Sequence, residues 1–227
     1  MNTNLAKGLT ENVRAFYEQH GAWFATTRGK VIPEHPFVSE FIRPGMTIVD
    51  VGAGNGRFAN LLPKNTCYIG IEPSEILRAL SLPSHLSLVP GTLPHLPLPD
   101  AVSDVTVCLA VLHHIPTQTT RRTSVEELIR ITKPGGIMLA TSWLRNPHGI
   151  AMTPISEGEA GDVWMPWQGL TSEEKGQRYV HFMQSGEWER LWTNPGLDIV
   201  QIGMYGKKDW TSDQTEALNW RVIAKRR

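Results

Sequence analysis

Short apolar runs alternate along the chain with segments whose apolar residues recur at the spacing of a helix. The runs predict buried strands at Met46–Val51, Cys67–Ile71, Leu86–Val89, Val105–Leu109 and Gly136–Ser142. The helical segments between them are a stretch from about Gly56, Ser74–Leu80 and Thr119–Thr132. Because parallel strands need a crossover helix between them, this alternation predicts an α/β fold with helices on both faces of a mostly parallel sheet.

Segments on either side of this alternating core complete the predicted domain. Helices are expected within residues 1–43 and near the C-terminus, at Asn12–Phe24, Glu34–Ile42 and Glu187–Trp192. Two further strands bring the predicted sheet to seven, at Leu197–Met204 and Ala217–Ala224. Residues 144–177 are rich in Gly, Pro, Ser and Glu, which predicts an irregular excursion near the carboxyl edge of the sheet. We expect residues 1–227 to form a single domain.

Composition and charge narrow the class of protein. The chain has 22 basic and 22 acidic side chains, so its net charge provides no bulk attraction for nucleic acid, although a local patch can act on a neutral average. The N-terminus lacks the apolar segment of a signal peptide, and no stretch is long enough to span a bilayer, so we expect a cytoplasmic protein that does not enter a membrane.

The two cysteines, Cys67 and Cys108, both lie in predicted strands. We therefore expect buried free thiols in place of a disulfide or a ligand pair. The histidines are scattered and share no metal-ligand spacing with these cysteines, so no metal site is predicted.

The most informative segment is the glycine-rich turn that follows the first predicted strand. Gly52, Gly54 and Gly56 are spaced so that the backbone can pass close to a ligand at the end of the strand. Asp50 lies just before this turn, where a carboxylate suits a cationic ligand and suits a pyrophosphate poorly. Glu72 ends the next strand, where an acidic side chain can accept both hydroxyls of a ribose. These residues predict a site for S-adenosylmethionine.

From about residue 10 to its end, the chain resembles the class I S-adenosylmethionine-dependent methyltransferases. That resemblance implies a Rossmann-like fold and assigns further residues to the cofactor site. Thr92 and Leu93 fall in the segment that flanks the adenine in the family, and Leu109 and Ala110 fall in the segment that lines the sulfonium and the methyl acceptor. The excursion at 144–177 would then lie near the acceptor site.

Several shorter segments resemble the tRNA wobble-uridine carboxymethyl methyltransferases. They are Ala110–His114 followed by Arg121 and Arg122, Thr26–Lys30, Gln177–Phe182 with Gly186 and Glu187, and Asn219 with Trp220. The resemblance implies that the enzyme esterifies the carboxylate of 5-carboxymethyluridine, with tRNA as its partner in tRNA modification. Eukaryotic members of that family work with a small zinc-binding activator subunit, which becomes a candidate partner.

A carboxylate acceptor determines which catalytic residues to expect. It is already ionised at neutral pH, so no general base is needed, and catalysis consists of aligning and desolvating it. Because a guanidinium binds a carboxylate with two hydrogen bonds, we expect Arg28 and Arg178 to bind the substrate, with Arg122 as a lesser candidate. The resemblance places His113 at the acceptor site.

Several of these residues also have a structural alternative. Arg121 and Arg122 would equally fit a solvated helix start, His113 and His114 could form a hydrogen-bonded pair in a loop, and His181 would fit a hydrogen-bonded structural role. Trp143 and Trp220 would either stack on a base or pack in the core.

Two other functions compete with tRNA modification. A methyltransferase for a small-molecule carboxylate or other metabolite would have an enclosed acceptor pocket, whereas the tRNA enzyme requires a basic rim. The candidates for that rim are Lys7, Arg28, Lys30, Arg121, Arg122, Lys207 and Lys208. A non-catalytic partner subunit would have no need of Asp50, the glycine turn and Glu72.

Overall fold

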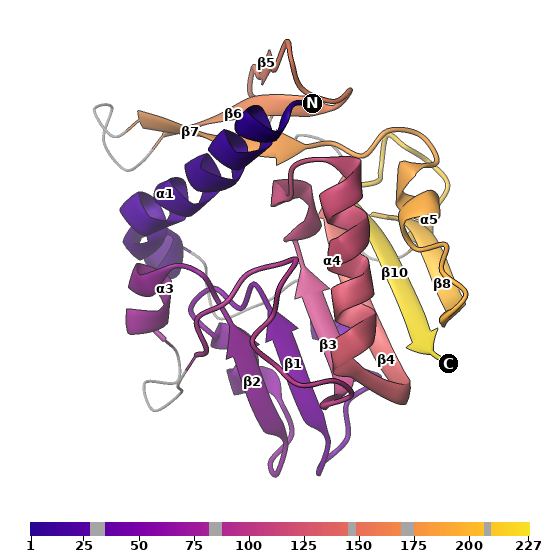
Figure 1. The fold of residues 1–227 in the computed structure, drawn as a ribbon. Helices are drawn as coiled ribbons and strands as arrows, with labels where there is room; N and C mark the ends of the chain where they lie inside the picture. Colours follow the sequence, from indigo (N-terminus) through magenta and orange to yellow (C-terminus); the bar gives the residue numbers. More distant parts are fainter. Residues whose placement is uncertain (28–34, 82–87, 145–148, 169–174, 207–209) are drawn as a thin grey trace.

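Seven strands form the central sheet of the computed structural model, which describes residues 1–27, 35–81, 88–144, 149–168, 175–206 and 210–227. They lie in the order β2-β1-β3-β4-β10-β8-β9 (Figure 1). Their bounds are β1 Thr47–Val51, β2 Cys67–Ile71, β3 Ser103–Leu109, β4 Thr132–Trp143, β8 Leu197–Tyr205, β9 Trp210–Thr211 and β10 Asn219–Arg226. β2, β1, β3 and β4 pair in parallel, and β10 is antiparallel to both β4 and β8. The predicted, mostly parallel sheet is confirmed.

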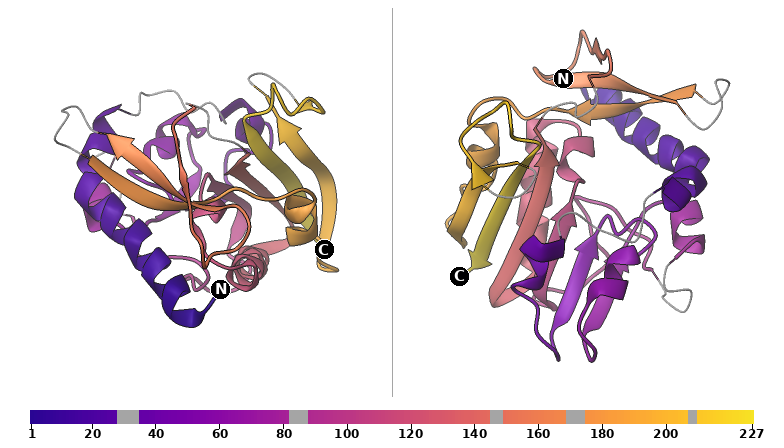
Figure 2. Two further views of the ribbon diagram at one scale, coloured as in Figure 1. Left: turned by 90° about the horizontal axis from the view of Figure 1, so that it is seen from above. Right: turned by 180° about the vertical axis from the view of Figure 1, so that it is seen from behind.

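Helices cover both faces of this sheet, as the sequence predicts. Strand side chains alternate between the faces, so Val49 and Val51 enter one apolar cluster and Ile48 enters the other. The helices on the two clusters are α4 (Gln118–Ile131) and α5 (Glu187–Leu191) on the first, and α2 (His35–Ser39) and the 3-10 helix η1 (Arg57–Leu61) on the second. The view from behind in Figure 2 shows α2 on the face opposite α4.

The two edges of the sheet differ from the prediction. Within the described part of the predicted strand Leu86–Val89, Val89 makes a single parallel bridge to Ile71 of β2. The seventh strand is instead β9, which pairs with β8 at the opposite edge. With only two residues, β9 is too short to show an alternating pattern in the sequence.

The predicted irregular excursion contains regular structure. Its described residues include β5 (Thr153–Pro154), β6 (Asp162–Gln168) and the start of β7 (Lys175–His181), which form a second, antiparallel sheet. Side chains on both faces of β6 are buried or partly buried, so the strand lacks a clear polar face that its sequence would reveal. Pro166 is accommodated because it lies where β5 does not reach and only β7 pairs with β6.

The second sheet and the first helix lie over the carboxyl end of the central strands. Helix α1 (Thr3–Thr27) is longer than the predicted segment and packs against β7 and α3 (Glu75–Ala79). Figures 1 and 2 show α1, β6 and β7 above the ends of β1 and β3. No helix in the described part of the chain is long and apolar enough to cross a membrane.

The two cysteines have different environments. Cys108 is buried in β3, as expected, but Cys67 is exposed at the first residue of β2. The prediction of two buried thiols is therefore wrong for Cys67, because this residue is the first of an edge strand whose exposure decreases toward its carboxyl end. Both thiols are free.

Candidate cofactor and acceptor site

The backbone of the turn after β1 adopts conformations that favour glycine. The φ angles of Gly52, Gly54 and Gly56 are +75°, +60° and +70°, all in the left-handed region. A Cβ atom on Gly52 would lie 2.3 Å from Cγ2 of Val111, so no side chain fits there. A Cβ on Gly54 would meet no such neighbour within 4 Å. The turn thus packs tightly against the segment after β3 on one side and leaves open space at its centre.

Asp50 is a buried carboxylate at the base of this turn, only 5% exposed. The hydroxyl of Tyr68, on the neighbouring strand, donates to its Oδ2 at 2.7 Å. Burial raises the pKa of Asp50 to about 6, against the opposing effects of the Tyr68 hydrogen bond and the Arg57 charge. In the described part of the chain, Asp50 forms no ion pair with a cationic side chain.

Glu72 follows β2 and is equally buried. Its two carboxylate oxygens accept hydrogen bonds from the backbone N–H groups of Gly54 and Ser74, both at 2.9 Å. Burial raises the pKa of Glu72 to about 7, although these two N–H groups act to lower it. Glu72 therefore links the glycine turn to the start of α3 and shares with Asp50 an environment poor in positive charge.

This arrangement fits S-adenosylmethionine. Two buried carboxylates with raised pKa values are stabilised by a ligand that brings positive charge and hydroxyl donors, which the amino-acid and ribose parts of this cofactor supply. A pyrophosphate would instead add negative charge to Asp50 and Glu72. The open space at Gly54 allows the ligand to approach the backbone.

The remaining predicted cofactor residues lie at the same edge of the sheet. Leu109 ends β3, and Ala110 has a φ of +57° that is held by hydrogen bonds from its nitrogen to the carbonyl and hydroxyl of Thr141. Leu93 is buried in the core cluster that contains Ile71, while the side chain of Thr92 is exposed. The structure brings these residues near the glycine turn, and their contacts with a cofactor stay a prediction.

Arg178 lies on β7, is 5% exposed and is surrounded by aromatic rings. Its guanidinium carbon is 4.9, 5.5 and 5.4 Å from the ring centroids of Phe16, Phe24 and Trp143. The Trp143 ring stacks on His113 at 4.5 Å and 20°, and the Trp143 backbone N–H donates to His113 Nδ1 at 3.4 Å. His113 is fully buried, and its stacked ring supports the ring of Trp143. Two predicted catalytic residues are thereby brought to one cluster.

Helix α1 and the 3-10 helix η2 (Leu112–His114) hold the strand that carries this buried arginine. His114 of η2 contacts the hydroxyl of Tyr17 through Nε2 and the carbonyl of Tyr179 through Nδ1, each at 3.0 Å. Asn12 of α1 accepts from the Tyr179 backbone N–H at 2.9 Å. Its amide also donates to the Gln177 carbonyl at 3.3 Å. These contacts determine where β7 lies relative to the carboxyl end of the central sheet.

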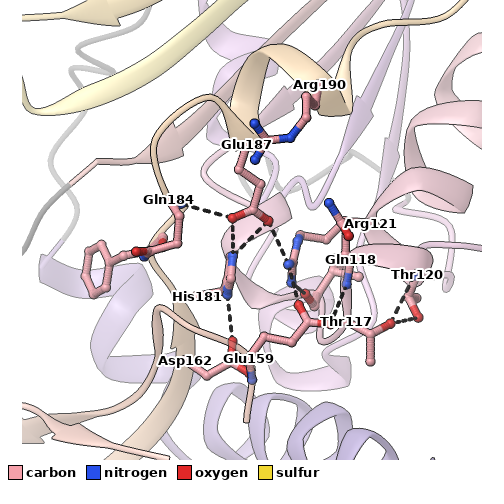
Figure 3. A network of polar contacts seen from close by, with 12 residues as sticks. Thr117, Gln118, Thr120, Arg121, Glu159, Asp162, His181, Gln184, Glu187 and Arg190 are labelled. Carbon is pink, nitrogen blue, oxygen red and sulfur yellow. Dashed lines mark hydrogen bonds and ion pairs between the residues drawn. The ribbon is translucent and has the colours of Figure 1, made fainter. Parts of the chain in front are cut away.

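Arg121 is not part of a basic rim. It is 1% exposed and its Nη2 pairs with Glu159 at 2.7 Å and Glu187 at 2.8 Å (Figure 3). His181 belongs to the same network, with Nδ1 2.6 Å from Asp162 and Nε2 3.0 Å from Glu187. The network joins α4, the small sheet and α5. The structure therefore assigns Arg121 and His181 a structural role.

The charges of this network stabilise one another. Burial acts to lower the pKa of His181, but hydrogen bonds with Asp162 and Glu187 outweigh it and raise the pKa above its usual value. Burial acts to raise the pKa of Glu187, but the His181 hydrogen bond and charge bring it down to about 2. The pKa of Asp162 is lowered in the same way by bonds from His181 and Tyr179 that outweigh burial.

Other predicted substrate residues are dispersed. Arg28 lies outside the described residues, as do Lys30, Lys207 and Lys208. Lys7 and Arg122 are exposed, and Arg122 borders a surface pocket between α4 and α5. Trp220 is 7% exposed and packs in the core, whereas Trp143 lies beside Arg178.

Two features of this region have no signal in the sequence. The hydrogen bond from the Tyr68 hydroxyl to Asp50 could not be predicted, because Tyr68 lies in an apolar run that predicts only a buried strand. Phe16 and Phe24 are spaced as one face of a helix, which predicts burial but not the buried cation that they contact.

Comparison with known proteins agrees with this geometry. A family described as "Methyltransferase domain" matches residues 49–140, which run from β1 into β4. The tRNA (carboxymethyluridine(34)-5-O)-methyltransferase of Schizosaccharomyces pombe is 28% identical over 222 residues, covering 88% of this chain and 94% of its own length. The protein of the same name in Arabidopsis thaliana is 30% identical over 148 residues, covering 63% of this chain, which spans only 36% of that relative.

Solved structures share the fold. The Burkholderia thailandensis 1,6-didemethyltoxoflavin-N1-methyltransferase, solved with bound S-adenosylhomocysteine, covers all of this chain and 91% of its own, with a TM-score of 0.65 at 13% identity. At 13% identity this structure supports only the fold. The use of S-adenosylmethionine is supported instead by the glycine turn and by the relatives in sequence. The chain is a class I S-adenosylmethionine-dependent methyltransferase, and its sequence resembles the tRNA (carboxymethyluridine(34)-5-O)-methyltransferases.

Proposed function

We propose that the chain transfers a methyl group to the carboxylate of 5-carboxymethyluridine at the wobble position of tRNA, forming a methyl ester in the cytoplasm. The observation that carries this proposal is the Arg178 guanidinium, buried among aromatic rings over the carboxyl end of the sheet. The printed names of the S. pombe and A. thaliana relatives support the same acceptor. A buried guanidinium is suited to a carboxylate, because it offers two parallel N–H donors and a permanent charge.

The cofactor-binding residues have separate roles in this proposal. Asp50 attracts the positively charged amino-acid part, and Glu72 accepts the ribose hydroxyls. The turn of Gly52, Gly54 and Gly56 lets the cofactor approach the backbone closely. The sides of the cofactor site are formed by Thr92, Leu93, Leu109 and Ala110. When bound, the cofactor supplies an electrophilic methyl group.

The acceptor side of the site aligns and desolvates the carboxylate. A carboxylate oxygen already carries the electron pair that it donates, so no side chain has to remove a proton. The rings of Phe16, Phe24 and Trp143 hold the Arg178 guanidinium in place, so little side-chain freedom is lost when the carboxylate binds. His113 acts by supporting Trp143. Helix α1 and the small sheet lie over the carboxyl end of the central strands (Figure 1), and in this proposal they keep water away from the aligned oxygen.

Other contacts of the proposed RNA lie outside this buried centre. We assign Arg28 to the substrate, as the sequence predicts, and the exposed Lys7 and Arg122 to its phosphates. A small zinc-binding activator subunit is retained as a candidate partner, tested by comparing activity with and without it.

The test is single-turnover transfer to tRNA that carries 5-carboxymethyluridine and to the same tRNA without the modification. We expect transfer only to the first, with rates that fall as ionic strength rises because phosphate contacts are screened. Arg178→Ala should cost about 2–5 kcal/mol in transition-state stabilisation, while affinity for S-adenosylhomocysteine is unchanged. Arg178→Lys, which keeps the charge but not the fork, should also lose most of the transfer rate.

A matched control is Arg43→Ala, which removes an exposed arginine just before β1, at the opposite end of the sheet from the site. Its transfer rate should equal that of the wild type. Equal transfer to a small free carboxylate, with no salt effect and no loss in the Arg178 variants, would reject the tRNA substrate in favour of a small-molecule acceptor.

A further inference from the structure

The carboxylate at the base of the glycine turn is held by a tyrosine on the adjacent strand. β1 and β2 pair in parallel, with Ile48 opposite Tyr68 and Asp50 opposite Gly70. Tyr68 therefore starts two residues before the level of Asp50, and its ring runs along the sheet so that the hydroxyl donates to Asp50 Oδ2 at 2.7 Å. Within the described part of the chain, no other group donates a hydrogen bond to this carboxylate.

Gly70 gives the Tyr68 ring its space. A Cβ on Gly70 would lie 3.0 Å from Cε1 of Tyr68, 3.0 Å from Cβ of Ala53 and 2.5 Å from Cδ2 of Leu88. A side chain at Gly70 is therefore excluded by lack of space. The backbone angle is not the cause, because the φ of Gly70 is not in the left-handed region. The small residue, the ring and the carboxylate form one packed unit at the junction of β1 and β2.

A neutral hydroxyl is a suitable partner for a carboxylate that has to receive a cation. It favours the ionised form by hydrogen bonding but does not cancel its charge, as an arginine or lysine would. Burial and the facing Asp50 raise the pKa of Tyr68 well above its usual value, so its hydroxyl keeps the proton that it donates. Asp50 Oδ1 is left for a ligand.

We propose that Tyr68 is a positioning residue for the cofactor, whose hydroxyl orients the Asp50 carboxylate and keeps it ionised to bind the α-ammonium group of S-adenosylmethionine. This inference rests on the assignment of Asp50 to the cofactor site. The inference does not depend on the identity of the methyl acceptor, because it concerns the amino-acid part of the cofactor.

The test compares two ligands by calorimetry: S-adenosylhomocysteine, which carries the α-ammonium group, and 5′-methylthioadenosine, which lacks the amino-acid part. Tyr68→Phe keeps the ring and removes the hydroxyl. We expect it to weaken S-adenosylhomocysteine binding about tenfold and to leave 5′-methylthioadenosine binding unchanged. Asp50→Asn should reduce the same affinity ratio, and Tyr68→Phe should add little in the Asp50→Asn background.

The chain offers a matched control in Tyr179, whose hydroxyl also donates to a buried aspartate, Asp162, at 2.7 Å. Tyr179→Phe removes an equivalent bond in the small sheet, and both ligand affinities should stay at the wild-type level. Melting temperatures of all variants establish that the proteins compared are folded.

The pH dependence supplies a second measurement. Asp50 is faced by Glu72 and Tyr68 from β2 and its end, by Arg57 from η1 and by Cys108 from β3. In the wild type the ratio of the two affinities should fall as pH drops through about 6, where Asp50 takes up a proton. Loss of the Tyr68 hydroxyl should move this fall to higher pH. Because both ligands carry the ribose that Glu72 is assigned to hold, the ratio cancels the titration of Glu72.

Two outcomes would overturn the inference, and they are distinguishable. If the affinity ratio is unchanged in Tyr68→Phe but reduced in Asp50→Asn, Tyr68 has no positioning role, while Asp50 still belongs to the cofactor site. If the ratio is unchanged in both variants, Asp50 does not belong to the cofactor site either. Neither result bears on tRNA methylation, because no acceptor is present.

Discussion

Two pairs of carboxylates in this protein have pKa values shifted in opposite directions, although burial acts to raise the pKa of all four. At the glycine turn, the pKa values of Asp50 and Glu72 rise to about 6 and about 7. In the network beneath the small sheet, the pKa of Glu187 falls to about 2 and that of Asp162 also lies below its usual value. All four side chains have little solvent exposure, but Asp50 and Glu72 lie deeper in the protein than Asp162 and Glu187, so burial accounts for part of the difference.

The rest of the difference comes from the groups that each carboxylate contacts. Glu187 has two cationic neighbours within 3.0 Å, Arg121 and His181, which the chain itself supplies. Asp50 and Glu72 instead accept bonds from a neutral hydroxyl and from backbone N–H groups. A carboxylate site without its own cation is completed by a ligand, whereas one with built-in cations is complete and stabilises the fold.

The largest expected effect tests whether the network is structural. Arg121→Leu leaves Glu159 without its ion-pair partner and Glu187 with His181 alone, and it should lower the free energy of unfolding by about 3–5 kcal/mol in urea denaturation. Arg122→Leu, next to it but exposed, should change this free energy by less than about 0.5 kcal/mol. Equal stabilities for the two variants would contradict the comparison.

An intermediate effect is expected at the glycine turn. Glu72→Ala should weaken S-adenosylhomocysteine binding by about 1–3 kcal/mol in calorimetry, because charge-assisted hydrogen bonds to the ribose are lost. Glu75→Ala, three residues later and exposed on α3, should bind as the wild type does. If folded Glu72→Ala bound with unchanged affinity, Glu72 would not belong to the cofactor site.

The smallest effect sharpens the comparison through pH. The raised pKa of His181 means that its contribution to stability is complete below its unfolded value and is lost as pH rises through the folded value. Between pH 6 and pH 9 the unfolding free energy should therefore fall more steeply in the wild type than in His181→Gln. The raised pKa values of Asp50 and Glu72 also lower the stability of the ligand-free protein as pH rises toward 7, but equally in both proteins.

If the unfolding free energy changed with pH by the same amount in the two proteins, the pKa of His181 would not be raised by folding. Repeating the measurement with saturating S-adenosylhomocysteine should remove most of the slope that belongs to Asp50 and Glu72, since the ligand favours their ionised forms. The slope that belongs to His181 should remain.

Local sequence was sufficient for the cofactor half of the molecule. The alternation of apolar runs and helical segments predicted the central sheet and its covering helices, although the strands at the two edges differ and the helix expected from about Gly56 is a short 3-10 helix. The sequence also predicted that Asp50, the glycine turn and Glu72 lie together, because each is at the carboxyl end of a strand and parallel strands bring those ends to one edge; the structure does bring them together, and their binding of the cofactor stays a prediction. Their position follows from short local sequence patterns and from the rule that parallel strands end at the same edge of a sheet.

The other half depended on contacts that no local pattern encodes. The sequence alone favoured Arg178 for binding substrate, kept Arg122 as a lesser candidate, and left Arg121 and Arg122 divided between a basic rim and a solvated helix start. The structure buries Arg121 against Glu159 and Glu187, which are 38 and 66 residues away, and it places Arg178 against the rings of α1. Whether a charged side chain binds a ligand or completes the fold is decided by its distant partners, because desolvation and pairing depend on what packs around it in space.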